Sequence, residues 1–276
     1  MIETALAASG EVAGKGLSIH LAPQVLTHVG TLPITNTLIT AWLVVFLVLT
    51  LTFLFRNSYR LIPSKGQILL ETMIGGAFDY VAETLESAEL AKKFFPIIMT
   101  IFIFILSLNW IGLLPGVDSI GIFKEHLGRH ALVGFLHPAN TDLNVTLAFA
   151  IIAFFTIEVA GVVLIGFWKY AGKFVNVKSF SKGILPGILG FVIGLIELIG
   201  EIARLISFSF RLFGNIFAGK TLLLVAIFFV PFVVPVPILA FEVFVGFIQA
   251  LVFSVLTLFF IKLAISEHSA EEHPAH

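Results

Sequence analysis

The sequence predicts an all-α integral membrane protein with five membrane helices, two of which form a long, steeply tilted hairpin, plus one amphipathic surface helix. Of its 276 residues, 58% are hydrophobic and only 12% are charged, and the mean hydropathy is +1.07. Soluble domains have about 25% charged residues, roughly twice the fraction in this chain. The apolar runs reach about 20 residues, the length that a helix needs to cross a bilayer.

The composition also excludes several classes of function. The net charge of −1 excludes a nucleic-acid binder that depends on phosphate neutralisation. With no cysteine, the chain has no disulfide, thiolate metal site or cysteine nucleophile. Lys220 and Thr221 follow Gly219, but the preceding glycine of a Walker-type loop is missing. We therefore expect no nucleotide site, no metal site and no cofactor.

Residues 1–33 are expected to form an external segment before the first membrane helix, which is predicted at about residues 34–55. Asn36 and the threonines beside it offer capping oxygens at its start. Basic residues follow it: Arg56, Arg60 and Lys65. Because basic flanks mark the cytoplasmic side, the N-terminus should lie outside.

An amphipathic helix on the cytoplasmic surface is predicted for about residues 67–93. Apolar residues recur there at steps of three and four, and five acids fall on the other side of the helical wheel, which is typical of a solvated face. The second membrane helix, at about residues 94–115, is predicted to begin near Pro96, because the first turn of a helix tolerates proline.

A polar segment, residues 117–141, should lie outside between the second and third membrane helices. Its histidines, His126, His130 and His137, lack zinc-like spacing, so we expect them to be solvated. The third membrane helix is predicted at about residues 142–168. Four lysines without an acid follow it on the cytoplasmic side: Lys169, Lys173, Lys178 and Lys182.

The fourth and fifth membrane helices are predicted at about residues 184–230 and 238–265, with a cluster of prolines between them. A helix over residues 184–230 would be about 70 Å long, whereas a hydrocarbon core is about 30 Å thick. It must therefore tilt steeply, lie partly in the membrane plane, or break. After five crossings, the polar tail of residues 266–276 should be cytoplasmic.

Ionisable residues inside apolar helices are costly and mark a function by default. Glu197, Glu201 and Arg204 are four and three residues apart, so they share one face of the long helix. Two interpretations stay open for this trio. The charges pair with one another near the cytoplasmic end, or they line a water-filled access path.

Arg211 does not fit pairing within its own helix. None of the residues one turn away is anionic: Ser207, Phe208, Gly214 and Asn215. A guanidinium keeps its proton at any physiological pH. If the last two helices form an antiparallel hairpin with Lys220 opposite Glu242, Arg211 lies near the neutral amide of Gln249. Small residues on the same face let another helix approach, which favours a carboxylate supplied by another protein.

Four motifs stand out: Phe210–Gly219 (FRLFGNIFAG), Asn109–Gly116 (NWIGLLPG), Asp142–Thr146 (DLNVT) and Gln249–Phe253 (QALVF). Together they resemble subunit a of the F-type ATP synthases, the membrane stator subunit. The resemblance extends from the first membrane helix to the tail, and the ten-residue motif is its most specific part.

The resemblance implies ion translocation, with the proton as the default ion, through two offset half-channels against the rotating c-ring, which couples the ion gradient to ATP synthesis. Arg211 is then the arginine that faces the ring and meets its carboxylates. The resemblance assigns six residues to the external half-channel: Asn215, Lys220, Glu242, Gln249, Asp142 and Asn144. To the cytoplasmic half-channel we assign Glu197, Glu201, Arg204 and Ser207.

The implied partners are the c-ring subunits, the peripheral-stalk b subunits and membrane lipid. The implied location is a bacterial plasma (inner) membrane, with the N-terminus outside and the C-terminus in the cytoplasm. Nucleotide catalysis would lie in other subunits, so the chain would not itself be an enzyme.

The sequence departs from the family at one pair of positions. Many bacterial members have an acid where Lys220 stands and a histidine where Glu242 stands. The swap preserves an opposite-charge pair and favours Glu242 over Lys220 as a proton relay, although a simple hairpin clamp stays open. The alternative function, a self-contained secondary transporter or channel, predicts internal repeats, and the five unequal segments show none.

Overall fold

The computed structural model describes residues 23–56, 63–114, 117, 121–126, 129–174, 184–231 and 233–266. Five helices in these ranges are long and apolar enough to cross a membrane: Asn36–Leu54, Ala88–Ile111, Leu143–Ile165, Gly187–Phe229 and Pro235–Ile265. The predicted all-α membrane fold is therefore confirmed. The predictions for residues 1–22, Arg60, Lys178, Lys182 and the tail beyond Ser266 lie outside the described residues.

The chain divides into two compact units, and each unit combines segments that are distant in sequence. The first contains Met1–Ile68, Thr100–Thr146 and Arg211–Leu251. The elements that lie entirely within it are β1 (Val25–Val29), β2 (Leu32–Thr35), α2 (Asn36–Arg56), β3 (Gly121–His126), β4 (Arg129–Gly134) and the 3-10 helix η2 (Ala139–Thr141).

The second unit contains Leu69–Met99, Leu147–Phe210 and Val252–His276. It holds α6 (Phe167–Phe174) and most of α3 (Lys65–Leu85) and α5 (Leu143–Ile165). Three long helices contribute to both units: α4 (Ala88–Ile111), α8 (Ile184–Phe229) and α9 (Pro235–Ser266).

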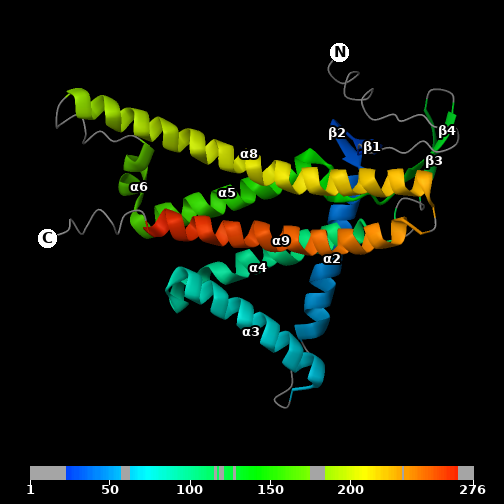
Figure 1. Cartoon of the computed structure of the whole chain (residues 1–276), viewed down its shortest axis with the longest axis horizontal. Coiled ribbons are helices and arrows are strands. Elements are labelled where there is room, and N and C mark those ends of the chain that lie inside the picture. The colour runs from blue at the N-terminus through cyan, green and yellow to red at the C-terminus, as the bar shows by residue number, and fades with distance from the viewer. Residues whose placement is uncertain are drawn as a thin grey trace. The chain divides into compact units, whose positions relative to one another are not determined.

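Helices α8 and α9 form the predicted antiparallel hairpin (Figure 1). In the second unit the ring centroid of Phe208 on α8 lies 4.9 Å from the ring centroid of Phe253 and 5.8 Å from that of Phe260, and both of these residues are on α9. The 46 residues of α8 form one continuous helix. A helix of that length is about 70 Å long, so of the three possibilities for this segment a break is excluded, and tilting or lying partly in the membrane plane remains.

The boundary between the surface helix and the second membrane helix lies earlier than predicted. Helix α3 ends at Leu85, and the next residue, Glu86, has a φ of 53°. The hydroxyl of Ser87 then accepts a hydrogen bond from the backbone N–H of Leu90 at 3.4 Å, which caps α4. Helix α4 therefore begins at Ala88 instead of near residue 94, and Pro96 lies inside it instead of in its first turn.

The third membrane helix ends at Ile165 instead of near residue 168, because Gly166 adopts a φ of 97° that favours glycine. The chain then enters α6, a short helix that was not predicted. Two antiparallel hairpins, β1–β2 and β3–β4, were also not predicted. Each is a two-stranded pair, too short to give a clear period-two pattern.

Candidate functional site

In the first unit, α8 and α9 bring polar side chains together in the register that the charges predicted. The side-chain amide of Asn215 donates a hydrogen bond to the amide oxygen of Gln249. One turn further along α8, Gly219 lies directly against the carboxylate of Glu242, which would collide with any Cβ at this position. Gln249 is thus at the level of Asn215, one turn from Arg211, and Glu242 is at the level of Gly219, the residue before Lys220, which is close to the predicted register.

The ammonium of Lys220 meets an imidazole that sequence reasoning did not find. Its Nζ lies 3.1 Å from Nδ1 and 3.3 Å from Nε2 of His137. The expectation of a solvated His137 is wrong, because this residue is only 3% exposed. Its backbone N–H donates to the hydroxyl of Thr40 at 3.0 Å, which anchors the segment before η2 to α2. Nothing in its local spacing could have indicated this contact.

A set of buried amides places α9 against α4. Asn140 donates to the side-chain oxygen of Asn109 at 2.6 Å, and Asn109 donates to the backbone carbonyl of Gly246 at 2.9 Å. Glu242, Gly246 and Gln249 are four and three residues apart, so they lie on one face of α9. The amide chain therefore fixes the face that presents Glu242, which is 4% exposed, and Gln249.

Asp142 and Asn144 make hydrogen bonds at the starts of α5 and α2. One carboxylate oxygen of Asp142 accepts from the backbone N–H and the side-chain amide of Asn144, at 2.9 and 3.1 Å. The other accepts from the hydroxyl of Thr37 at 2.8 Å. This is the geometry of a helix N-cap that also ties α5 to α2. These two residues thus have a structural role at that point, whatever else they do.

The second unit contains the pair expected from shared helical spacing. Arg204 donates to the carboxylate of Glu201 at 2.7 Å, and its guanidinium lies 4.0 Å from the centroid of the Phe260 ring. Glu201 is 2% exposed. Glu197 is half-buried and Ser207 is exposed on the same helix. The interpretation of Glu201 and Arg204 as an ion pair is therefore confirmed.

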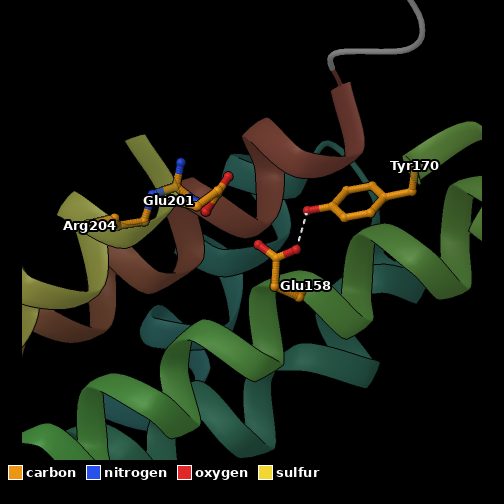
Figure 2. Close-up of polar contacts among 4 residues, drawn as sticks. All are labelled: Glu158, Tyr170, Glu201 and Arg204. Carbon is orange, nitrogen blue, oxygen red and sulfur yellow. Dashed lines mark hydrogen bonds and ion pairs between the residues drawn. The ribbon is translucent and has the colours of Figure 1, made fainter. Parts of the chain in front are cut away.

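A second polar contact in this unit was not predicted (Figure 2). The hydroxyl of Tyr170 on α6 donates to the carboxylate of Glu158 on α5 at 2.9 Å. Burial, followed by the charge and the hydrogen bond of Glu158, raises the pKa of Tyr170 far above its ordinary value. A signal was available in the sequence, because Glu158 is the only ionisable residue in α5.

Comparison with known proteins decides the family. A family model described as "ATP synthase A chain" matches residues 38–262. "ATP synthase subunit a" of Geotalea uraniireducens (strain Rf4) is 35% identical over 226 residues, which cover 82% of this chain and 86% of that protein. "ATP synthase subunit a" of Moorella thermoacetica is 28% identical over 249 residues, which cover 90% of this chain and 99% of that protein.

The chain belongs to the ATP synthase A chain family. Membership supports an ion-translocating role in the membrane part of the F-type ATP synthase, and it is consistent with a non-catalytic subunit. With its five apolar helices, this member of the family is a multi-pass membrane protein. The matched residues include His137, and also Glu158 and Tyr170, which sequence reasoning did not single out.

Proposed function

We propose that the chain carries ions, by default protons, through two offset half-channels against a rotating c-ring and so couples the ion gradient to ATP synthesis. Its partners in this function are the c-ring subunits, whose carboxylates meet Arg211, and the peripheral-stalk b subunits. The chain lies in a bacterial plasma membrane, with its N-terminus outside and its C-terminus in the cytoplasm.

One observation carries this proposal: ionisable side chains that are buried or half-buried occur before and after Arg211 along one continuous apolar helix. Glu201 and Arg204 precede Arg211 on α8, and Lys220 follows it. Placing ionisable groups within membrane helices is costly, and proteins keep them there for ion pathways and relays. Two half-channels separated by a cation require ionisable groups on both sides of that cation, and α8 has them on both sides of Arg211.

Arg211 is the cation that separates the two half-channels. A ring carboxylate can face lipid cheaply only when it is neutral, so it must be protonated before it leaves the protein surface. Beside the permanent charge of Arg211 the carboxylate is stabilised as an anion, and the proton leaves there. A membrane potential drives each elementary charge with about 2.3 kcal/mol per 100 mV.

The external half-channel then uses the cluster of the first unit. Glu242 takes up protons as the relay, and Lys220 with His137 holds the opposite side of the entrance. Asn215 and Gln249, which bond to each other one turn from Arg211, give the ring carboxylate neutral polar neighbours as it approaches. The cytoplasmic half-channel uses the Glu201–Arg204 region, with Glu197 and Ser207 on the same helix.

The test is Arg211→Ala in the whole complex reconstituted into vesicles. We expect the complex to assemble with its full set of subunits and to lose ATP synthesis more than 100-fold, because nothing then separates the two half-channels. The control is Arg56→Ala, which removes an exposed arginine at the end of α2. Near-normal synthesis by Arg211→Ala, or ion transport by the isolated chain in liposomes, would contradict the proposal.

A further inference from the structure

Three helices of the second unit bring four ionisable side chains to one place (Figure 2). Glu158 comes from α5, Tyr170 from α6, and Glu201 and Arg204 from α8. The contacts within the group are the 2.9 Å hydrogen bond from Tyr170 to Glu158 and the 2.7 Å ion pair of Glu201 with Arg204. The hydroxyl of Tyr170 also lies within electrostatic range of Glu201 and Arg204. The two pairs therefore form one cluster.

The sequence around Tyr170 is arranged so that its hydroxyl reaches Glu158. Tyr170 is 4% exposed, whereas the neighbouring Trp168 is 86% exposed on the same short helix. The ring of Tyr170 lies directly against Gly161, where a Cβ would collide with it. Gly161 and Glu158 are three residues apart and share one face of α5. The ring packs on the glycine and its hydroxyl extends to the carboxylate.

Stability alone does not account for this arrangement. A carboxylate in an otherwise apolar membrane helix is destabilising relative to an apolar side chain, and such residues typically belong to ion pathways. A tyrosine ring could cover Gly161 equally well without a carboxylate beneath its hydroxyl. The carboxyl group on α5 therefore calls for a role that an apolar residue could not perform.

We propose that Glu158 is a proton-carrying residue of the cytoplasmic half-channel and that Tyr170 is the residue that positions it. This inference rests on the proposed function and extends it to α5 and α6. A proton that leaves the ring carboxylate breaks its O–H bond there and forms one with an oxygen of Glu158. The same proton then passes to water on the cytoplasmic side, which restores the carboxylate.

The two residues divide the work because their chemistry differs. The raised pKa of Tyr170 keeps its hydroxyl protonated throughout the physiological range, so it remains a hydrogen-bond donor and does not carry protons itself. Glu201 is held by Arg204, so its charge is already compensated. The hydrogen bond that Glu158 accepts comes from a neutral hydroxyl, and a carboxyl oxygen can accept it in both the charged and the protonated form.

The deciding variant is Glu158→Gln, tested in the complete complex in vesicles. The glutamine oxygen can still accept the Tyr170 hydrogen bond, so a structural role would survive, but the side chain no longer exchanges a proton. We expect assembly to be retained and ATP synthesis to fall at least tenfold, with Glu158→Asp restoring most of it. The control is Glu89→Gln, which removes an exposed carboxylate in the first turn of α4 and should leave the rate unchanged.

The second variant is Tyr170→Phe, which keeps the ring against Gly161 and removes only the hydroxyl. We expect the rate to fall several-fold and its dependence on cytoplasmic pH to shift, while its dependence on external pH stays as in the wild type. An assembled Tyr170→Phe complex with both pH profiles unchanged would overturn the proposal, even if Glu158→Gln failed to assemble. So would wild-type synthesis by Glu158→Gln.

These outcomes are separate from a failure of the proposed function. If Arg211→Ala abolishes coupled synthesis and Glu158→Gln does not, only the inference about α5 and α6 is wrong. If Arg211→Ala retains coupled synthesis, the half-channel assignment itself is wrong.

Discussion

The two units bury polar groups in different ways. In the first unit neutral amides connect the helices, beside the charged Asp142, Glu242 and Lys220: Asn140 bonds to Asn109, Asn109 to the Gly246 carbonyl, and Asn215 to Gln249. The second unit relies on charges and a carboxylate–hydroxyl pair: Glu201 with Arg204, and Glu158 with Tyr170. A neutral amide costs less to bury than an ion, so it can serve as a fixed support. Burying an ionisable group costs more, so we expect such a group where its charge or its proton has a function.

This difference predicts where single substitutions do most damage. Removing one partner of a buried ion pair leaves an uncompensated charge, whereas removing one partner of an amide pair leaves only an unsatisfied dipole. Substitutions in the ion pair of the second unit should therefore cost more stability than equivalent substitutions in the amide pairs of the first.

The largest effect is expected from Arg204→Met. It leaves the carboxylate of Glu201, which is 2% exposed, without its cation. The expected loss is about 3–5 kcal/mol, read as a lower temperature of thermal denaturation of the purified complex in detergent. The double variant Glu201→Leu/Arg204→Met should recover most of that stability, because no charge is left uncompensated. A double variant as unstable as Arg204→Met would show that the pair acts through packing rather than charge.

A smaller effect is expected from Asn140→Leu in the first unit. The leucine keeps the volume but removes the donor to Asn109, leaving a buried amide oxygen unsatisfied. The expected loss is about 1–3 kcal/mol in the same measurement. Thr52→Val is the control, because the Thr52 hydroxyl is exposed on α2 and bonds only within its own helix. If Asn140→Leu proves as costly as Arg204→Met, the contrast between the two units fails.

The parts of the fold that depend on burial of apolar side chains could be predicted from the sequence. Long apolar runs gave all five membrane helices, because backbone groups in lipid must be satisfied within the segment. The register of α8 against α9 could also be predicted, because placing Lys220 opposite Glu242 in the sequence brings Glu242 to the level of Gly219, where the structure has it.

The contacts made by loops and short elements could not be predicted. The burial of His137 depends on its backbone bond to Thr40, nearly one hundred residues earlier, and no local pattern encodes it. The Tyr170–Glu158 contact requires the positive φ of Gly166 to turn α6 so that its tyrosine returns to α5. Glu158 alone could have been noticed from its place in an apolar helix, but its partner could not.

The smallest effect is expected at an ion pair on the surface of the second unit, where a carboxylate also pairs with a cation but is exposed to solvent. Lys262 donates to Glu86 at 2.8 Å, and the side chain of Glu86 is 77% exposed. This hydrogen bond, followed by the charge of Lys262, holds the pKa of Glu86 below its ordinary value of 4.5. Because the pKa is lowered in the folded state, the contribution to stability is present above pH 4.5 and is lost as the pH falls through the lowered pKa.

Glu86→Gln should therefore denature at a slightly lower temperature than the wild type at pH 7, and the difference should vanish in acid. A large difference in denaturation temperature at pH 7, or one that persists in acid, would contradict this prediction. It would mean that exposure to solvent does not weaken the Lys262–Glu86 pair relative to the buried pair of Glu201 and Arg204.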